Sequence, residues 1–345
     1  MNEYIKREAA KYKLFARCYT YNQKRFILDT LHGFAIQRTS FPFACVIVDD
    51  ASQDGEQNVI NDFIEKKCDV GTSVAFENEL LKLISVRHKE NTNCFFYFYL
   101  LKINLFRSPE KKSQIIQPWR DACLYEALCE GDDYWVDDNK LQKQYDILEN
   151  DKTVSFVYTG FTSVNEDGAY LDRPFLDTYQ SHSHSGNVFF DLLVNLNFIM
   201  TLTVVLRVSC RKDMPIEYYD YGIFLNWERQ GNAVFLPDKT SCYRYNKNSI
   251  TNTVKDSLLP KFYYIVFNEV RKAFTRENTS EIIYKEKQYL TILGYVIARN
   301  IRKSTERKNF ITFTLSHPSL YYHVIKGFFI KLFAEKKIRS YVNKL

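Results

Sequence analysis

Two carboxylates stand side by side in residues 130–135, which read Glu-Gly-Asp-Asp-Tyr-Trp and directly follow an apolar run. In open α/β sheets, ligands bind beyond the carboxyl ends of the strands. Neighbouring carboxylates repel each other unless a cation lies between them, and a hard divalent ion shared with substrate phosphates removes that repulsion. The segment therefore predicts a metal and phosphate site, with a solvated acidic turn as the alternative.

A second polar segment, residues 48–55, reads Val-Asp-Asp-Ala-Ser-Gln-Asp-Gly and also follows an apolar run. Asp50, Ser52 and Asp54 stand near the spacing of a calcium-binding loop. The twelfth position counted from Asp50 is Asn61, where such a loop needs a bidentate Glu, and no helix precedes the segment. We therefore reject a calcium loop here.

The segments around these motifs alternate between strand and helix patterns. The continuous, β-branched run at 43–48 is typical of a buried parallel strand. Further strands are expected at 14–19, 83–86, 125–129, 154–158, 201–208 and 233–236. Helices are expected over the first 13 residues and at 26–34, 59–67, 140–148 and 223–230. Periodicity does not assign the aromatic run at 95–105. This alternation predicts a doubly wound α/β sheet.

Composition bounds the class of protein. The 345 residues are 46% hydrophobic and 26% charged, which is typical of a globular chain with one large domain and an appendage, or with two domains. The eight cysteines contain no C-x-x-C pair, which disfavours a zinc site. The polar N-terminus resembles no secretory signal, so a reducing, cytoplasmic compartment is expected. The sequence has no run of 18 or more apolar residues, so no membrane-spanning segment is expected.

The net charge of +6 is distributed unevenly. Residues 301–345 carry ten Lys or Arg and two Glu, which is a net +8, so the remainder carries a net −2. We place a domain boundary near residue 255, between a sheet domain (1–255) and a basic, mainly helical region (256–345). That region is either an amphipathic surface for an anionic membrane or a helical cap with a solvated basic face.

Several segments resemble the successive landmarks of glycosyltransferase family 2, in the order and approximate spacing of that family. The matching segments are 19–22 (Tyr-Thr-Tyr-Asn), 48–55, 129–135, 141–144 and 157–159. The resemblance covers about residues 14–250. It implies a GT-A fold, which is a doubly wound mixed sheet flanked by helices, and an inverting enzyme that uses a nucleoside diphosphate sugar.

The resemblance also implies roles for individual side chains. Tyr19 would lie against the nucleobase, and Asp50 would hydrogen-bond to it. Asp132 would face the ribose, and Asp133 would ligate Mg²⁺ or Mn²⁺ on the diphosphate. We also expect Trp135 to bind the substrate. The metal would offset the negative charge that develops on the departing diphosphate.

An inverting transfer needs a base for the acceptor hydroxyl. In the family, an acidic residue lies before a helix and a Leu-Pro-type strand, and Asp220 has that position ahead of a predicted helix at 224–229 and a strand at 235–237. Asp220 is therefore the candidate catalytic base, and Glu217 is the second choice. A helix N-cap is the alternative role of Asp220, and both roles are compatible.

Some residues depart from the family pattern. Glu126 stands where an apolar strand residue is usual. Residues 87–121 do not follow the family's usual pattern of small residues and an Arg, and Arg120 or Lys89 is a candidate for contact with the diphosphate. Lys247 stands close to the place where the family often carries a metal-reaching His, and it would supply compensating charge.

Two further pairs have open interpretations. His182 and His184 alternate in a polar segment, which is typical of a loop on the acceptor side rather than of a metal site. Thr201 and Thr203 lie on an expected strand that, by the resemblance, borders the acceptor pocket. Plain sheet packing explains them equally well.

The sequence thus predicts an inverting glycosyltransferase that moves a sugar from a nucleotide sugar, UDP-linked by preference, to a glycan or lipid-linked saccharide. A role in bacterial surface polysaccharide synthesis, at the inner face of the cell membrane, is implied by resemblance alone. A nucleotidyltransferase is disfavoured because residues 19–23 contain no Gly. A catalytically silent binding module is disfavoured because the acidic residues are present. A nucleic-acid partner is not expected, since the positive charge lies outside the sheet domain.

Overall fold

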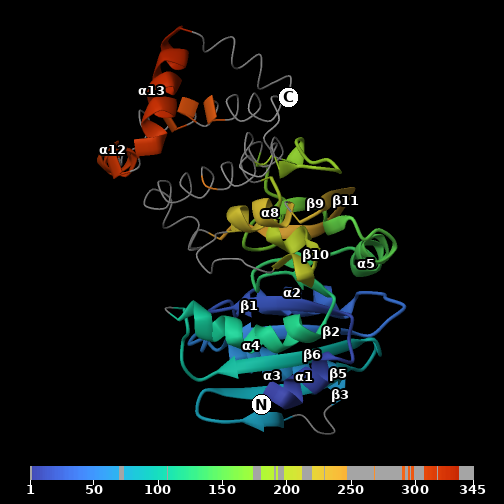
Figure 1. Ribbon diagram of the computed structural model, residues 1–345. Helices are drawn as coiled ribbons and strands as arrows, with labels where there is room; N and C mark the ends of the chain where they lie inside the picture. Colours follow the sequence, from blue (N-terminus) through green and yellow to red (C-terminus); the bar gives the residue numbers. More distant parts are fainter. Residues whose placement is uncertain are drawn as a thin grey trace. The chain divides into compact units, whose positions relative to one another are not determined.

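The structure is a computed structural model in which the chain divides into two compact units (Figure 1). Unit 1 comprises Met1–Gly186, Ile199–Ile216 and Gln230–Asn246, and unit 2 comprises Asn187–Phe198, Glu217–Arg229 and Lys247–Leu345. The residues described are 2–69, 74–106, 108–173, 180–189, 192, 198–211, 220–228, 230–246, 268, 290–291, 294–295, 297–298, 307–316 and 318–333. The boundary expected near residue 255 lies outside them.

Unit 1 is built on one sheet with the strand order β3-β5-β6-β2-β1-β7-β10-β9-β11-β8, and β4 pairs with β5. The strands from the N-terminus to the middle of the chain are β1 (Leu14–Thr20), β2 (Phe43–Asp49), β3 (Cys68–Asp69), β4 (Val74–Glu77), β5 (Leu81–His88) and β6 (Cys94–Leu101). The remaining strands are β7 (Tyr125–Leu128), β8 (Tyr134–Trp135), β9 (Val154–Val164), β10 (Val205–Arg207) and β11 (Asn232–Arg244).

The centre of the sheet is parallel. β6, β2, β1 and β7 run in the same direction, whereas β5 and β10 are antiparallel to their neighbours. The expected doubly wound mixed sheet is confirmed, and the aromatic run that periodicity left unassigned forms β6. Because parallel neighbours end at the same edge, the segments after Thr20, Asp49 and Leu128 meet there.

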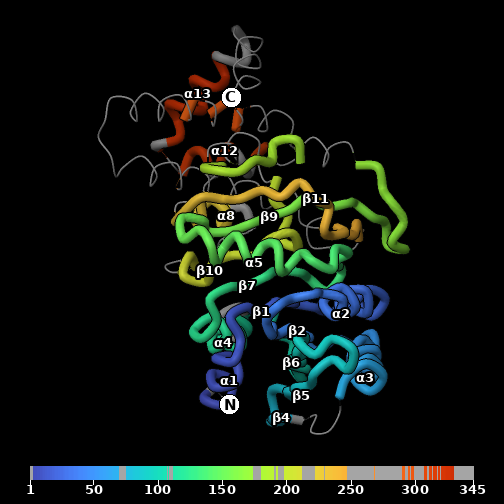
Figure 2. The backbone as a smooth tube through the Cα atoms, turned by 90° about the vertical axis from the view of Figure 1, so that its right-hand side faces the viewer, coloured from blue at the N-terminus to red at the C-terminus, as the bar shows by residue number. Residues whose placement is uncertain are grey.

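Helices cover both faces of the sheet. The helices of unit 1 are α1 (Asn2–Ala9), α2 (Ile27–Ala35), α3 (Glu56–Lys67), α4 (Pro109–Ala122) and α5 (Lys140–Asn150). Figure 2 shows α1 and α4 on one side of the sheet and α2 and α3 on the other. Two apolar cores result, one that includes residues of α2, α3 and α5 and one that includes residues of α1 and α4. Fully buried strands therefore explain the continuous apolar runs.

One expected strand is shorter in the structure. Of residues 201–208, only β10 (Val205–Arg207) forms a strand, and it lies between two 3₁₀ turns, η1 (Thr201–Thr203) and η2 (Val208–Arg211). The N–H of Thr203 donates to the carbonyl of Met200 (3.0 Å), and its hydroxyl donates to the same oxygen (2.7 Å). These local hydrogen bonds replace the strand ladder.

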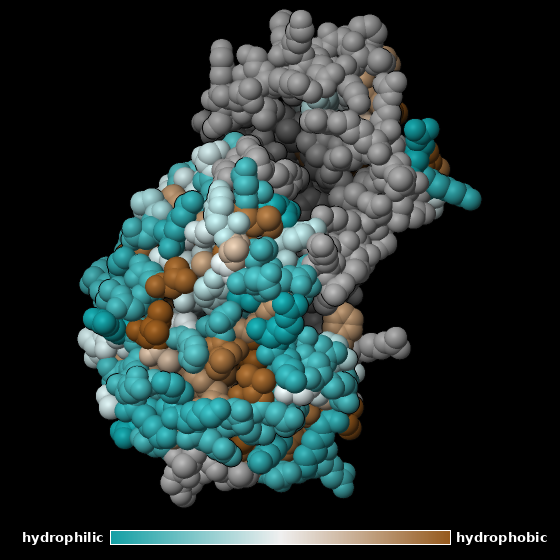
Figure 3. All heavy atoms as spheres, turned by 180° about the vertical axis from the view of Figure 1, so that it is seen from behind, coloured by the Kyte–Doolittle hydropathy of each residue, from teal (hydrophilic) through white to brown (hydrophobic). Residues whose placement is uncertain are grey.

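The described parts of unit 2 are mainly helical and include α8 (Asp220–Glu228), α12 (Arg307–Ser316) and α13 (Pro318–Phe333). Gly327 of α13 lies against Gly294, since a Cβ on Gly327 would come within 2.5 Å of the main-chain nitrogen of Tyr295. Glycine thus permits a close backbone approach. In the part of the chain that is described, no helix is both long and apolar enough to span a membrane. Figure 3 shows a largely hydrophilic surface with scattered apolar patches.

Candidate functional site

Three chain segments meet at the carboxyl end of β1. The N–H of Asp50, just after β2, donates to the carbonyl of Thr20 (3.0 Å), and the N–H of Gly131, after β7, donates to the carbonyl of Tyr19 (3.0 Å). The residues expected at a ligand site are therefore brought together around two adjacent residues of β1. The polar segments that the sequence singled out share one edge of the sheet.

The loops after β1 and β2 interlock. Asn22 (φ 53°) and Ala51 (φ 61°) adopt the left-handed conformation, which is uncommon for residues other than glycine. The N–H of Asn22 donates to the hydroxyl of Ser52 (2.9 Å), and the Asn22 side-chain oxygen accepts from the N–H of Gln53 (2.8 Å). The residue Asn22 thus fixes both loops to each other at the edge of the site.

Glu56, the first residue of α3, is hydrogen-bonded to the same two loops. Its fully buried carboxylate accepts hydrogen bonds from the hydroxyl of Thr20, the N–H of Gln23 (2.7 Å) and the hydroxyl of Ser52 (2.9 Å). Burial raises the pKa of Glu56 to about 7, although these hydrogen bonds oppose the rise. Sequence reasoning missed this residue, and an acid directly after the glycine of a polar loop was the signal.

The acidic loop after β7 is held close to the β1 loop. A Cβ on Gly131 would lie 2.6 Å from Cβ of Thr20 and would also collide with the Thr20 hydroxyl and the Gln23 side chain. The hydroxyl of Thr30, on α2, lies 2.6 Å from the carbonyl of Asp133 and 3.1 Å from that of Gly131. Residue 131 is therefore a glycine because there is no room for a side chain. Thr30 of α2 holds the same loop by hydrogen bonds.

Asp133 is the buried carboxylate of this loop, with 4% of its surface exposed. Its Oδ1 accepts a 2.8 Å hydrogen bond from the N–H of Arg244. Burial and the charge of Asp132 raise the pKa of Asp133 well above its ordinary value, and burial raises the pKa of Asp132 as well. This pair of carboxylates would be stabilised by a cation.

The side chain of Arg244, the last residue of β11, is itself held in place by several neighbouring groups. Its guanidinium donates to Asp29 (Nη2 to Oδ2, 2.7 Å) and to the carbonyl of Glu166 (3.2 Å), and it lies 4.6 Å from the ring of Phe26. The role of its main chain was not visible in the sequence, because 111 residues separate it from Asp133.

The donor set fits a cation shared with a substrate. Among the described residues, no group of three or more His, Cys, Asp or Glu side chains is arranged to hold a metal ion. Mg²⁺ sites on phosphates often use only one or two carboxylates, with the remaining ligands supplied by phosphate oxygens and water. Asp132 and Asp133 therefore suit a metal bound together with a diphosphate and do not form an all-protein site.

Asp50 is already paired in the structure. It is 2% exposed, its Oδ1 accepts from the N–H of Leu105 (2.6 Å), and its Oδ2 is ion-paired with Lys112 of α4. The Lys112 ammonium lies 5.4 Å from the centre of the Tyr19 ring. The carboxylate expected to bind a nucleobase is thus ion-paired with a lysine that also lies near Tyr19, the ring expected to stack on that base.

Trp135 lies in the core rather than at the surface. It is 1% exposed, its indole N–H donates to the carbonyl of Leu202 (2.9 Å), and its ring packs on Phe34 (4.7 Å between centroids). The ammonium of Lys140 lies 4.5 Å from the Trp135 ring, and burial lowers the pKa of this lysine to about 7. The indole ring is therefore part of the apolar core.

The other candidate residues have partners of their own or lie outside the described part of the chain. Arg120 is bound to Glu126 (Nε to Oε2, 3.0 Å), and Lys89 donates to the carbonyls at the end of α3. Asp220 begins α8 in unit 2, but its side chain, like Glu217 and Lys247, is outside the described part of the chain. The hydroxyl of Tyr158 donates to the carbonyl of His184 and accepts from its N–H.

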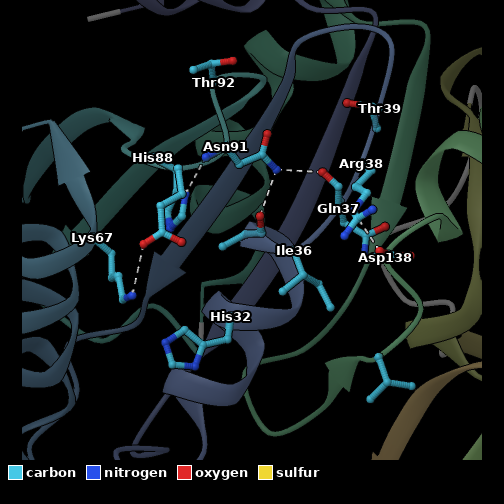
Figure 4. A pocket seen from close by; sticks show the side chains of 13 residues that line it. His32, Ile36, Gln37, Arg38, Thr39, Lys67, His88, Asn91, Thr92 and Asp138 are labelled. Carbon is cyan, nitrogen blue, oxygen red and sulfur yellow. Dashed lines mark hydrogen bonds and ion pairs between the residues drawn. The ribbon is translucent and has the colours of Figure 1, made fainter.

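A separate hollow of about 930 Å³ lies at the opposite, amino-terminal edge of β2 and β6. Its wall is formed by the end of α2, the turn before β6 and the segment after β8 (Figure 4). The side chain of Asn91 donates to the carbonyls of Ala35 (2.8 Å) and Gln37 (2.7 Å), and its N–H donates to the His88 ring (3.0 Å). This hollow is distinct from the junction at Tyr19 and the acidic loop.

Comparison with known proteins agrees with this architecture. The chain resembles the TarS fragment 1–349 of S. aureus in complex with UDP-GlcNAc (TM-score 0.54, 14% identity, 91% of this chain and 88% of that chain). It also resembles the same fragment in complex with UDP (TM-score 0.52, 14% identity, the same coverage). The chain spans 44% of the longer TarS structure. The chain therefore shares the fold of the TarS fragment.

In sequence, the chain is 26% identical over 303 residues to an uncharacterized protein of Mycobacterium tuberculosis, Rv1520, and to its counterpart in Mycobacterium bovis. The match covers 82% of this chain and 72% of each relative. No family model matches the chain. The similarity includes residues of both compact units, and the names of these relatives state no activity.

Proposed function

We propose that this protein is a glycosyltransferase that uses a nucleoside diphosphate sugar, with UDP as the preferred nucleotide. The observation that carries the proposal is the junction at the end of β1, where the carbonyl of Tyr19 accepts from the N–H of Gly131 and the carbonyl of Thr20 accepts from the N–H of Asp50. This junction lies at the carboxyl edge of a doubly wound sheet, where ligands of such folds bind. The likeness to TarS in complex with UDP-GlcNAc supports the same nucleotide class.

In this proposal, the nucleobase lies against Tyr19 and hydrogen-bonds to Asp50, and Asp132 faces the ribose. Base recognition by Asp50 requires that one of its oxygens exchange Lys112 for a base N–H. Lys112 then remains at the same place as a donor and a positive charge. The buried ring of Trp135 belongs to the apolar core.

Asp133 holds the proposed metal, Mn²⁺ or Mg²⁺. The N–H of Arg244 binds Oδ1 and so fixes the orientation of the carboxylate. A divalent cation bound there supplies a Lewis acid that offsets the charge on the departing diphosphate. The protein contributes the fixed carboxylates and the closely packed loop, which need no reorganisation during the reaction.

For the acceptor side, we propose an inverting transfer in which Asp220 removes the proton of the acceptor hydroxyl. Attack on the anomeric carbon and loss of the diphosphate then occur on opposite faces of the sugar. The acceptor is a glycan or lipid-linked saccharide, in bacterial surface polysaccharide synthesis at the cytoplasmic face of the membrane. Residues 1–255 form the catalytic domain in this proposal, and residues 256–345 form the appendage.

Membrane contact through α12 and α13 is part of the same proposal. Tyr322, Ile325 and Phe329 are exposed at helical spacing on α13, and Ile311 and Leu315 are exposed on α12. Together with the basic residues of this region, they suit an anionic lipid surface. Sedimentation with anionic vesicles at physiological salt tests this, and an unbound protein would contradict it.

A thermal-shift screen of nucleoside diphosphates, with and without Mn²⁺, tests the donor proposal. Stabilisation by UDP that requires Mn²⁺ is the expected result, since a ligand that binds only the folded state raises the melting temperature. Binding of nucleoside triphosphates in preference to diphosphate sugars would favour a nucleotidyltransferase. Donor binding without any transfer would favour a silent module.

A further inference from the structure

A single buried carboxylate on the β7 strand is paired with three arginines from different parts of the chain. Glu126 is fully buried, and its carboxylate contacts Nε of Arg17 (3.0 Å), Arg120 (3.0 Å) and Arg211 (2.6 Å). Burial raises the pKa of Glu126, but the three guanidiniums lower it by a larger amount, so that the resulting pKa is about 2. The carboxylate is therefore ionised and can hold a guanidinium in a fixed place.

Arg17 connects this buried pair to the proposed donor site. It lies on β1 two residues before Tyr19, so both side chains are on the same face of the sheet. Its guanidinium carbon lies 4.4 Å from the centre of the Tyr19 ring, and Nη2 lies 3.4 Å from Glu130, the first residue of the acidic loop. One anchored guanidinium thus contacts both halves of the junction.

We propose that Arg17, anchored by Glu126, is a positioning residue that holds the Tyr19 ring in place for the nucleobase of the donor. A planar guanidinium stacks on an aromatic ring and donates hydrogen bonds from its edge to a carboxylate at the same time, which a lysine ammonium does not do. The ring is then ordered before the donor binds, so less conformational freedom is lost on binding. This inference rests on the proposed donor site.

The test compares Arg17→Lys with a matched control, Arg207→Lys. Arg207 of β10 also lies over a tyrosine, 5.5 Å from the ring of Tyr125, and donates to the carbonyl of Leu148 (2.7 Å), away from the junction. Titration calorimetry measures the affinity of each variant for UDP with Mn²⁺ and for inorganic pyrophosphate with Mn²⁺. Pyrophosphate has no base, so it reports on the metal and phosphate part alone.

Arg17→Lys is expected to weaken UDP binding about threefold to tenfold, the range of one stacked cation, and to change pyrophosphate binding less than about twofold. Arg207→Lys is expected to change neither. In a Tyr19→Leu background, Arg17→Lys should have little further effect on UDP, because the ring that it positions is gone.

Three results would overturn the inference: an unchanged affinity of Arg17→Lys for UDP, an equal loss for UDP and pyrophosphate, or a full effect that persists without the Tyr19 ring. A wild-type protein that binds pyrophosphate with Mn²⁺ but no nucleoside diphosphate would instead overturn the donor proposal itself. The melting temperatures of Arg17→Lys and Arg207→Lys show whether any loss reflects general destabilisation.

Discussion

The main-chain N–H of Arg244 donates a 2.8 Å hydrogen bond to Oδ1 of Asp133, which joins the end of β11 to the acidic loop. The carboxylate is oriented by the backbone of a strand, so a substitution of the arginine side chain would leave this hydrogen bond in place. The same strand end therefore defines where a cation and a diphosphate would be held.

Asp133→Asn should abolish the Mn²⁺-dependent part of nucleotide binding without lowering the stability of the ligand-free protein. The raised pKa of Asp133 means that its buried charge is unfavourable, and an amide of the same shape removes that charge. Thermal shifts with UDP, with and without Mn²⁺, measure both effects. Asp146→Asn, at an exposed position on α5, is the control. A retained Mn²⁺ response in Asp133→Asn would remove this residue from the metal site.

Glu56 should make the folded state less stable as the pH rises. Its pKa is about 7 in the folded protein and 4.5 ordinarily, so between these values the unfolded chain releases a proton that the folded protein keeps. The stabilisation is fully present below pH 4.5 and is lost by about pH 7, with a magnitude of about 3 kcal/mol.

Glu56→Gln isolates this contribution. The wild-type melting temperature should fall between pH 5 and pH 8 by more than that of the variant, because other buried acids titrate in both proteins. Differential scanning calorimetry at a series of pH values measures the difference. Parallel curves for the two proteins would mean that Glu56 is ionised normally in the fold.

The sequence identifies those elements whose pattern is decided locally. The run that forms β2 is continuous and β-branched, and both motif loops follow apolar strands, so their meeting at one sheet edge follows from strand order. The run that forms β6 is uniformly apolar, which periodicity alone does not distinguish from a buried helix.

The missed features depend on distant partners. The Lys112 partner of Asp50 comes from α4, 62 residues away, and the burial of Trp135 depends on Phe34 and Leu202. No local pattern contains these contacts. Likewise, the unusual Glu126 is noticeable in the sequence, but its three arginines are brought together only by the fold.

Gly131→Ala should disrupt nucleotide binding through a steric effect. The new Cβ would collide with Thr20 and Gln23, so the loop must move, at a cost of about 1–3 kcal/mol. Gly186→Ala is the control, because its positive φ (106°) strains an alanine at the bridge to Ala233, at the opposite end of β11 from Arg244. We expect both variants to lose stability, but only Gly131→Ala to lose UDP affinity about tenfold or more. Equal UDP affinities in the two variants would contradict the close-packed junction.

Asp220→Asn should eliminate sugar transfer while donor binding persists, because an amide cannot accept the proton of the acceptor hydroxyl. A loss of turnover of about 10²-fold or more is expected for a general base. Turnover with a donor sugar and calorimetry with UDP separate the two effects. If Asp220→Asn retains turnover and Glu217→Gln loses it, the base role belongs to Glu217.

A crystal structure with UDP and Mn²⁺, with anomalous scattering recorded for manganese, tests the central claim most directly. We expect an anomalous peak at the carboxylate of Asp133 and the uracil ring against Tyr19. A nucleotide bound elsewhere, for example in the hollow beside His88 and Asn91, with no manganese peak at the acidic loop, would contradict it.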